Sequence, residues 1–282
     1  MASEPVASGP SEANLENPAM ATPDSKIDHA ASIRYWNSVA ANSNTMLGML
    51  GSYPWYTRID LRGSKSFLSK VRRLVPGCTT EGKLKLGADC GAGVGRVTEG
   101  FLKDVCETVD AVEPVEKFTQ VIRDSALKGS GIVGDIYTVG LEGWYPEKKY
   151  DLIWTQFCVG HLTDVQLVEY FVRCRESLTE TGIVVVKENQ STDPNGNDMY
   201  DDEDSSVTRT DEKFKEIFKQ AGLIVVTSEL QLGFPKNFKL LPGIYIQYIG
   251  YTWDLKHIFV NLAVHNWKAA AVSVEDISEF MA

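Results

Sequence analysis

The sequence predicts an α/β domain built around a mainly parallel β-sheet. After the Pro-Gly breaker at residues 76–77, short apolar runs alternate with segments of helical periodicity, a pattern typical of repeated βα units. A glycine-rich turn follows the first apolar run, as in open sheets that bind a ligand at the carboxyl ends of their strands. No stretch of about 20 apolar residues occurs, so we expect no membrane-spanning helix.

The elements can be taken in chain order. Aromatic and aliphatic residues at helical spacing over 33–50 predict one or two short helices, and a turn-rich stretch leads from them to a helix over 64–74. Apolar runs predict strands over 84–91, 108–114, 131–139, 150–157, 182–189, 222–230 and 244–253. Helices are expected over 164–178, where the apolar residues form one stripe, over 211–220, and over the partly apolar stretch 255–281.

Composition limits the class of protein and the class of partner. Of the 282 residues, 43% are apolar and 10% aromatic, which is enough to build a core and excludes a largely disordered or collagen-like chain. The formal charge of −10 argues against nucleic acid as the main partner and favours a basic substrate. Residues 1–30 hold five acids, one Lys and few large apolar residues, which predicts a disordered acidic tail.

The five cysteines show neither CxxC pairs nor the spacing of a metal site. Their odd number, in a chain without a recognisable signal peptide, predicts reduced thiols in a cytoplasmic protein. We therefore expect no disulfide framework and no bound metal.

The most informative motif is ADCGAGVGR, residues 88–96, where the first strand should end and a helix begin. Gly91 and Gly93 let the backbone approach a ligand closely, and free N–H groups at a helix start favour an anionic group. Glu113 follows Gly91 by 22 residues, at the expected end of the second strand, where a carboxylate can accept hydrogen bonds from both hydroxyls of a ribose.

Arg96 separates two classes of cofactor. The dinucleotide fingerprint requires Gly or Ala at this position, because a bulky side chain impedes close packing of the helix. A guanidinium can instead bind a carboxylate with two hydrogen bonds, which favours the methionine end of S-adenosylmethionine. A nicotinamide cofactor, or an ordinary βα turn with a surface arginine, stays open as an alternative.

Two later segments are candidates for the acceptor site. Gln156, Phe157 and His161 follow the fourth strand, and the imidazole is a candidate general base because it titrates near neutral pH. A lone histidine at a helix start is also commonly structural. The acidic run 201–204 follows the fifth strand and would attract a basic substrate, although such runs most often form solvated loops.

Long motifs then resemble one family. Over residues 33–238 the chain closely resembles the alpha N-terminal protein methyltransferases. The motifs that carry this resemblance are YW (35–36), MLG (46–48), RID (58–60), DCGAGVGRVT, YDLIWTQFCVGHLTD, GIVVVKEN and DDEDSSVTR. These enzymes add one, two or three methyl groups to the α-amine of proteins that begin with Xaa-Pro-Lys or Xaa-Pro-Arg once Met is removed. The resemblance implies a Rossmann-like, seven-stranded S-adenosylmethionine-dependent methyltransferase fold with an N-terminal helical lid over 31–76.

The resemblance also assigns roles by position. On the cofactor side it places Gly91, Gly93 and Arg96 at the methionine end, Glu113 at the ribose, Leu141 and Glu142 beside the adenine, and Gln156 in the pocket wall. On the acceptor side it places Trp36 near the terminal residue, Phe157 against the substrate proline, Asn189 on the substrate backbone, Asp201 and Ser206 at the basic third residue, and Asp204 with His161 at the proton of the α-amine. It further implies ribosomal proteins among the substrates, a monomer, and a nuclear as well as a cytoplasmic location.

The chain departs from the family pattern in four ways, one of which is a slightly longer segment over 48–57. Glu113 replaces the frequent Asp, and Phe157 replaces the frequent Trp. We expect the methyltransferase domain over 31–242, because the resemblance stops there; residues 243–282 are either a lineage-specific extension or, as we prefer, a translated intron or wrong frame. A catalytically inactive binder of Xaa-Pro-Lys N-termini and a small-molecule methyltransferase are the alternative functions.

Overall fold

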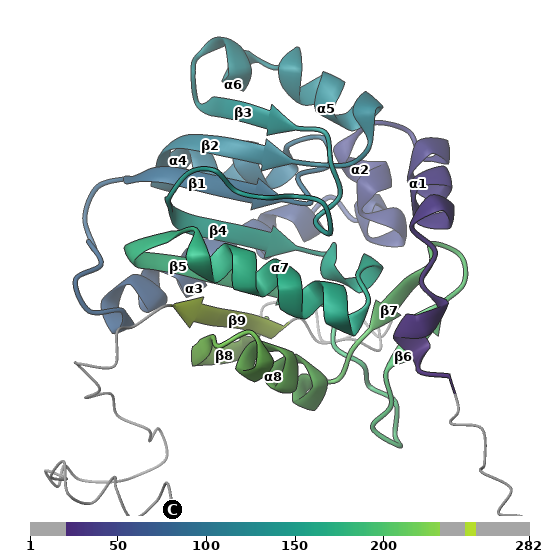
Figure 1. Cartoon of the computed structure of the whole chain (residues 1–282). Helices are drawn as coiled ribbons and strands as arrows, with labels where there is room; N and C mark the ends of the chain where they lie inside the picture. Colours follow the sequence, from purple (N-terminus) through teal and green to yellow (C-terminus); the bar gives the residue numbers. More distant parts are fainter. Residues whose placement is uncertain (1–20, 232–245, 252–282) are drawn as a thin grey trace, which may run out of the picture. The chain divides into compact units, whose positions relative to one another are not determined.

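A seven-stranded sheet forms the centre of the computed structural model, which describes residues 21–231 and 246–251 (Figure 1). In the order of their pairing the strands are β3 (Val133–Tyr137), β2 (Cys106–Val112), β1 (Leu84–Cys90), β4 (Tyr150–Gln156), β5 (Leu178–Glu188), β9 (Ile246–Tyr251) and β8 (Ile224–Leu230). Neighbouring strands from β3 to β5 are parallel, and β9 runs antiparallel to both β5 and β8. The predicted mainly parallel sheet is confirmed.

Helices cover both faces of this sheet. The helix α3 (Tyr56–Leu74) packs on one face, and α7 (Asp164–Glu176) and α8 (Asp211–Gln220) pack on the other (Figure 1). Shorter helical segments are η1 (Pro23–Lys26), α1 (His29–Ser38), α2 (Ser43–Met46), η2 (Gly48–Ser52), η3 (Thr98–Leu102), α4 (Lys103–Val105), α5 (Glu116–Arg123), α6 (Ala126–Gly129) and η4 (Val159–His161). Within the described residues, no helix combines the length and apolarity needed to cross a membrane.

The core lies on both sides of the central strands. Trp154 of β4 packs toward α3, its ring centroid 4.8 Å from that of Phe101, whereas the adjacent Ile153 packs toward α7 and α8. Successive strand residues point to opposite faces, so a strand covered on both faces must be apolar at nearly every position. This explains the apolar runs 152–154 in β4 and 183–186 in β5.

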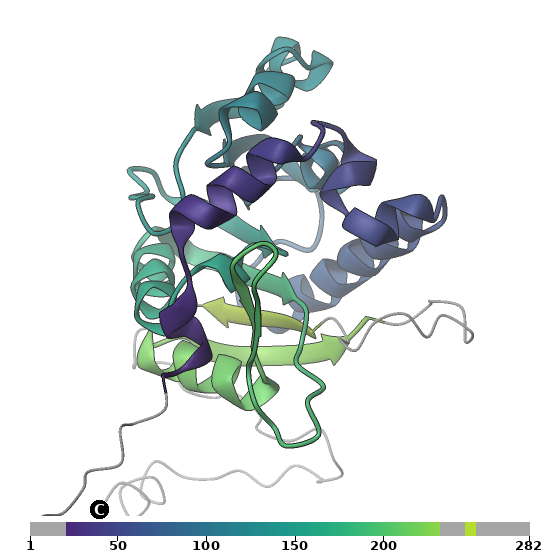
Figure 2. The same ribbon diagram turned by 90° about the vertical axis from the view of Figure 1, so that its right-hand side faces the viewer.

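The carboxyl ends of the parallel strands all point to one edge, and Figure 2 looks onto this edge. The helices α1 (purple) and α2 and the hairpin formed by β6 (Met199–Asp201) and β7 (Ser206–Thr208) lie there. Of the predicted lid, α1 and α2 therefore lie beyond the strand ends, whereas α3 packs on the sheet.

The structure corrects three expectations about the N-terminal half and the acidic run. Residues 21–30, expected in a disordered tail, form η1 and begin α1, because Asp28 caps α1 by accepting the N–H groups of Ala30 and Ala31. The helix expected over 64–74 begins at Tyr56, which is fully buried. The acidic run belongs to the β6–β7 hairpin, which the sequence did not predict.

The strand predicted over 244–253 is present as β9, between β5 and β8. The sheet therefore continues to Tyr251, beyond the expected domain end at 242. The helix predicted over 255–281 lies outside the described residues.

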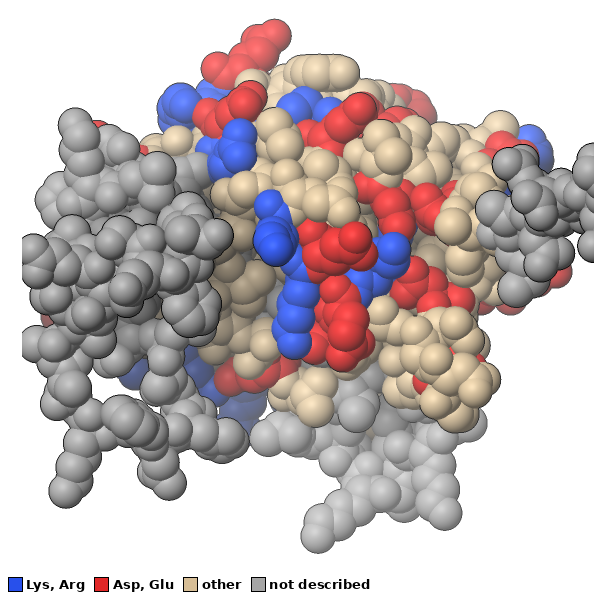
Figure 3. All heavy atoms as spheres, turned by 60° about the horizontal axis from the view of Figure 1, so that its bottom comes forward, with Lys and Arg blue, Asp and Glu red and all other residues tan. Residues whose placement is uncertain are grey.

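Charge is mixed on the face of the molecule that Figure 3 presents. Figure 3 shows acidic and basic side chains interspersed over the face that it presents. The excess of acidic residues therefore does not make that face uniformly negative. Where a basic ligand would bind is then decided by local contacts.

A substitution of Phe171 tests the packing between α7 and α8. The Phe171 side chain is fully buried, and its ring centroid lies 5.0 Å from that of Phe218. We expect Phe171→Ala to lower the free energy of unfolding by about 3–5 kcal/mol, because it leaves a cavity at this helix contact. Chemical denaturation measures the change. Val165→Ala is the matched control, since Val165 is on the same helix and 69% exposed; a change within about 0.5 kcal/mol is expected there. Equal effects of the two substitutions would contradict this packing.

Candidate active site

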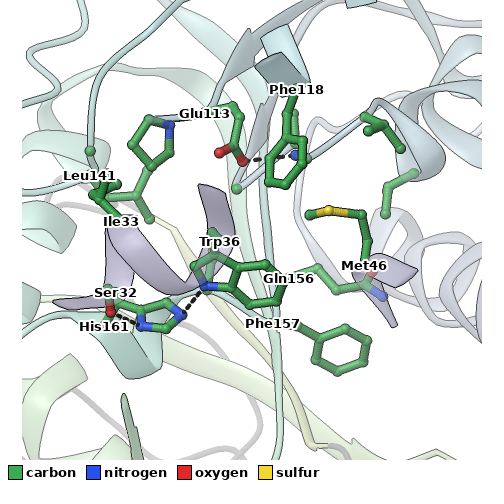
Figure 4. A pocket seen from close by; sticks show the side chains of 18 of the residues that line it. Ser32, Ile33, Trp36, Met46, Glu113, Phe118, Leu141, Gln156, Phe157 and His161 are labelled. Atoms are coloured by element: carbon green, nitrogen blue, oxygen red, sulfur yellow. Dashed lines mark hydrogen bonds between the residues drawn. The ribbon is translucent and has the colours of Figure 1, made fainter. Parts of the chain in front are cut away.

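A pocket opens at the carboxyl edge of the parallel strands (Figure 4). From the α1–α2 region it is lined by His29, Ser32, Ile33, Trp36, Met46 and Leu47. From the ends of β1 and β2 it is lined by Gly91, Ala92, Gly93, Val94, Arg96, Val97, Glu113, Pro114 and Phe118. The loops after β3 and β4 contribute Gly140, Leu141, Glu142, Gln156, Phe157, Cys158, His161 and Leu162.

The glycine-rich turn after β1 forms the floor of this pocket. Gly91 and Gly93 have φ angles of 72° and 55°, which other residues rarely adopt. A Cβ at Gly91 would lie 2.5 Å from Cys158 Cβ, and one at Gly93 would lie 2.8 Å from Met46 Cε. The turn's N–H groups are not free as expected: those of Gly91 and Ala92 donate to the carbonyl of Val112. The glycines therefore allow a ligand to approach the backbone closely, whereas the N–H groups of Gly91 and Ala92 are not available to bind an anion.

Glu113 lies at the end of β2, as predicted, and its side chain faces the pocket (Figure 4). Its two carboxyl oxygens accept the N–H groups of Gly93 and Val115, each at 2.9 Å. Burial raises the pKa of Glu113 to about 7. Each oxygen keeps a second lone pair, so the ionised group can still accept two hydroxyl donors from a ribose.

Arg96 is held by a buried cluster around Asp60, a residue of α3. Its guanidinium lies 2.8 Å from Asp60 Oδ2, and the Lys187 ammonium is ion-paired with the same carboxylate. Gln156 Nε2 also donates to Asp60 Oδ2, at 3.0 Å. Lys187 further donates to the carbonyl of Asp60 and to Ser64 Oγ, each at 3.0 Å. The Asp60 carboxylate thus fixes the side chains of two pocket residues, Arg96 and Gln156.

The charges of this cluster do not balance. Asp60 and Lys187 are fully buried, and the Arg96 side chain, 10% exposed, lines the pocket. Burial opposes ionisation of Asp60, but the two cations outweigh it and hold its pKa below the usual range. Two cations around one carboxylate leave a positive charge at the pocket wall, where a ligand carboxylate is favoured. The residues therefore fit the methionine end of S-adenosylmethionine.

His161 lies across the pocket, between two residues of α1 (Figure 4). Trp36 Nε1 donates to His161 Nε2 at 3.2 Å, and Ser32 Oγ lies 2.8 Å from His161 Nδ1. Burial lowers the pKa of His161, although the nearby Asp204 opposes this shift. The neutral imidazole is therefore favoured near neutral pH, and a neutral imidazole can accept a proton.

Asp204 lies in the turn of the β6–β7 hairpin, beside His161. Its backbone carbonyl accepts the Ser32 hydroxyl at 2.6 Å. Its side-chain Oδ1 is buried and has no hydrogen-bond partner within the part of the chain that the structure describes. A buried carboxylate oxygen without a donor is costly, so this position favours a ligand that brings one.

Two residues beside the pocket have strained backbones. Phe157, directly after β4, and Ser205, directly after Asp204, have φ angles of 56°. Such positions cost of order 1–3 kcal/mol and persist where surrounding contacts enforce them. Phe157 N–H donates to the carbonyl of Lys187 at 3.0 Å, and Ser205 Oγ accepts the N–H of Asp28 at 2.8 Å. Both strained residues are thus tied to another segment of the chain.

The structure separates the predicted site residues into two groups. Those that line the pocket are Trp36, Gly91, Gly93, Arg96, Glu113, Leu141, Glu142, Gln156, Phe157 and His161. Asn189, Asp201, Asp204 and Ser206 are not among the lining residues. The hairpin nevertheless packs against η4, since a Cβ at Gly160 would lie 3.3 Å from Ser206 Cβ. Asn189 follows β5, and its N–H donates to Glu188. The roles assigned to individual residues stay predictions.

The sequence did not identify the residues that hold His161 and Arg96 in place. Besides Ser32 and Asp60, these include Glu188 and Arg209, which bind opposite sides of the η4 backbone: Glu188 accepts the N–H of Val159, and Arg209 donates to its carbonyl. One signal was available. Lys187 and Glu188 directly follow the apolar run 183–186 of β5, and ionisable residues at such a place require buried partners.

Comparisons with known proteins agree on one family. A family model described as AdoMet dependent proline di-methyltransferase matches residues 24–245. The chain is 42% identical over 213 residues to alpha N-terminal protein methyltransferase 1 of Schizosaccharomyces pombe, covering 74% of this chain and 91% of that protein. It is 38% identical over 206 residues to N-terminal Xaa-Pro-Lys N-methyltransferase 1-A of Xenopus laevis, covering 71% and 87%.

Solved structures show the same fold. A SAM-dependent methyltransferase from Leishmania major is 30% identical and matches with a TM-score of 0.67 over 79% of this chain and 82% of its own. A Burkholderia thailandensis N1-methyltransferase with bound S-adenosylhomocysteine, 16% identical, matches with a TM-score of 0.54 over 83% and 92%. The fold is that of the S-adenosylmethionine-dependent methyltransferases, and S-adenosylmethionine is the cofactor.

Binding of S-adenosylmethionine should depend on the ionisation of Glu113. Both ribose hydroxyls can donate to this group only when it is ionised, and its pKa in the free protein is about 7. Affinity should therefore rise with pH through 7 and then level off, being about tenfold weaker at pH 6 than at pH 8. Calorimetric titration measures it. Glu113→Gln should bind more weakly and lose this pH dependence. A wild-type affinity that is constant from pH 6 to pH 8 would contradict the assignment.

Proposed function

The chain belongs to the family of AdoMet-dependent proline di-methyltransferases, and we propose that it methylates the α-amino group of proteins that begin with Xaa-Pro-Lys or Xaa-Pro-Arg after removal of Met. The observation that carries this proposal is the arrangement of His161 and Asp204. A neutral imidazole stands beside a carboxylate whose buried Oδ1 has no donor within the described residues. An α-ammonium group supplies both a proton for the imidazole and a donor for the carboxylate.

The chemistry requires such a pair. A protonated amine has no lone pair, and the pKa of an α-amine is about 7.7–8.0, so a weak base suffices to deprotonate it. When bound, S-adenosylmethionine supplies a methyl group activated by the positive charge on its sulfur. His161 accepts the proton of the ammonium, and Asp204 accepts a remaining N–H and orients the nitrogen. Each further methylation needs a new deprotonation, so His161 serves every round, whereas Asp204 accepts an N–H only while the deprotonated amine retains one.

Neighbouring residues suit the rest of the substrate. Phe157 and Trp36 line the pocket and offer aromatic surface to a proline, which is rigid and brings no N–H to bury. Asp201 is exposed on the hairpin, where we place the basic third residue together with Ser206, and we place the substrate backbone at Asn189. We further propose ribosomal proteins among the substrates and a monomeric enzyme of cytoplasm and nucleus, as in the family that the motifs resemble.

A synthetic Xaa-Pro-Lys peptide tests the proposed function. Incubated with S-adenosylmethionine, it should gain mass in steps of one methyl group, whereas its N-acetylated copy should not change, because acetylation removes the basic lone pair. Mass spectrometry measures both. Methylation of the acetylated copy would contradict α-amine specificity. Peptide binding without any mass gain would instead indicate an inactive binder.

Asp204→Asn tests the carboxylate. We expect kcat to fall at least about a hundredfold, because the neutral amide no longer holds the ammonium beside His161, while the Kd for S-adenosylmethionine changes less than about twofold. Steady-state kinetics and calorimetry measure the two quantities. Asp202→Asn is the matched control, since Asp202 lies exposed in the same turn. Equal losses of turnover and of cofactor affinity would contradict the assignment of Asp204 to the acceptor side. An equal effect of Asp202→Asn would contradict it as well.

A further inference from the structure

Ser32 occupies a buried position on α1, one helical turn before Trp36, so both side chains face His161 (Figure 4). We propose that Ser32 is a positioning residue that, together with the Trp36 N–H, holds the neutral His161 with its proton on Nδ1, which leaves Nε2 as the nitrogen that receives the substrate's proton. This inference rests on the proposed function for its role in the reaction. The tautomer itself follows from the contacts alone.

The direction of each hydrogen bond can be assigned. An indole N–H can only donate, so His161 Nε2, 3.2 Å from Trp36 Nε1, must accept. A neutral imidazole with an accepting Nε2 carries its hydrogen on Nδ1, which therefore donates to Ser32 Oγ at 2.8 Å. The Ser32 hydroxyl keeps its own hydrogen for the carbonyl of Asp204, at 2.6 Å. Every donor in this chain of hydrogen bonds has an acceptor.

The opposite tautomer would break two of these bonds. A hydrogen on Nε2 would face the Trp36 N–H, which places two donors against each other. Ser32 would then have to donate to Nδ1, and the carbonyl of Asp204 would lose its hydroxyl donor. Because Ser32 is only 4% exposed, water has little access to replace that donor. The surroundings of His161 therefore select one tautomer.

The helix that carries Ser32 is held at both ends. At its start, the N–H of Asp28 donates to Ser205 Oγ at 2.8 Å. At its end, the Lys117 ammonium of α5 donates to the carbonyls of Asn37, at 2.7 Å, and Val39. These contacts fix α1 relative to both the hairpin and the cofactor side of the pocket. Ser32 therefore sets the position of His161 and of the Asp204 backbone together.

This arrangement defines the proton's path. The substrate ammonium takes the place of the Trp36 N–H and gives its proton to His161 Nε2. The resulting imidazolium still donates from Nδ1 to Ser32. The freed lone pair of the amine forms the new bond to the methyl carbon as the carbon–sulfur bond breaks, and that bond's electrons remain on sulfur. An imidazolium cannot accept the indole N–H. The hydrogen bond from Trp36 Nε1 to His161 Nε2 can therefore form again only after His161 loses the proton from Nε2.

Nitrogen-15 NMR of the full-length protein tests the tautomer directly. The His161 signals are assigned by their absence in His161→Gln. In the wild type without ligands at pH 8, Nε2 should have the shift of an unprotonated imidazole nitrogen and Nδ1 that of a protonated one. In Ser32→Ala the Nδ1 proton loses its acceptor, so the fraction of His161 with the proton on Nδ1 should fall even though the Trp36 N–H still faces Nε2. The kcat on an Xaa-Pro-Lys peptide should fall at least tenfold while the Kd for S-adenosylmethionine stays within twofold.

Two further variants make the test specific. Ser32→Thr retains the hydroxyl and should restore the wild-type tautomer and most of the turnover. Ser38→Ala is the matched control, because Ser38 is exposed on the same helix and should change neither quantity. A proton on Nε2 in the wild type would overturn the inference whatever the state of Ser32→Ala, since the wild-type spectrum stands alone. An unchanged tautomer fraction in folded Ser32→Ala would overturn the role of Ser32. A wild type with the expected tautomer that methylates no such peptide would overturn the proposed function instead.

Discussion

The buried carboxylate of Asp60 is the interaction on which the cofactor side of the pocket depends. It joins α3, the turn after β1 and the end of β5 through Arg96 and Lys187. Buried ion pairs stabilise a fold only when their remaining hydrogen-bonding groups are satisfied, and here Gln156 and Ser64 take up much of that capacity. The surplus positive charge lies at the pocket wall, where it favours an anionic ligand. The side chains that stabilise the fold here therefore also set the charge of the pocket.

The two halves of the pocket are built differently. The cofactor half uses the ends of β1 and β2, whose backbones are fixed by the sheet. The opposite side is lined by residues of α1, which meets the β6–β7 hairpin through side-chain contacts of Ser32 and Ser205. Since backbone pairing resists displacement more than single side-chain bonds do, an opening of the pocket is easier on the side of α1. The strained Phe157 stands between the halves.

The sequence predicts the parts of this structure whose causes are local. Two-sided burial produces the apolar runs of β1, β4 and β5, and the glycine-rich turn locates the pocket. Threonine caps fix the predicted starts of α7 and α8 at Asp164 and Asp211. Other features depend on distant residues. Asp60 meets Arg96 and Lys187, which are 36 and 127 residues away, so nothing near it in the chain reveals its role. The hairpin is short, and its strands have no apolar run.

The contacts of α1 also bear on how the protein is made. Its hydrogen bonds to His161 and to the hairpin reach residues 125 to 177 positions later in the chain. At synthesis rates of about 5–20 residues per second, α1 therefore waits roughly 6 to 35 s for these partners. His161 and Asp204 are both present only after the strands β1 to β5 have been translated. The nascent chain therefore passes most of its synthesis without this pair in place.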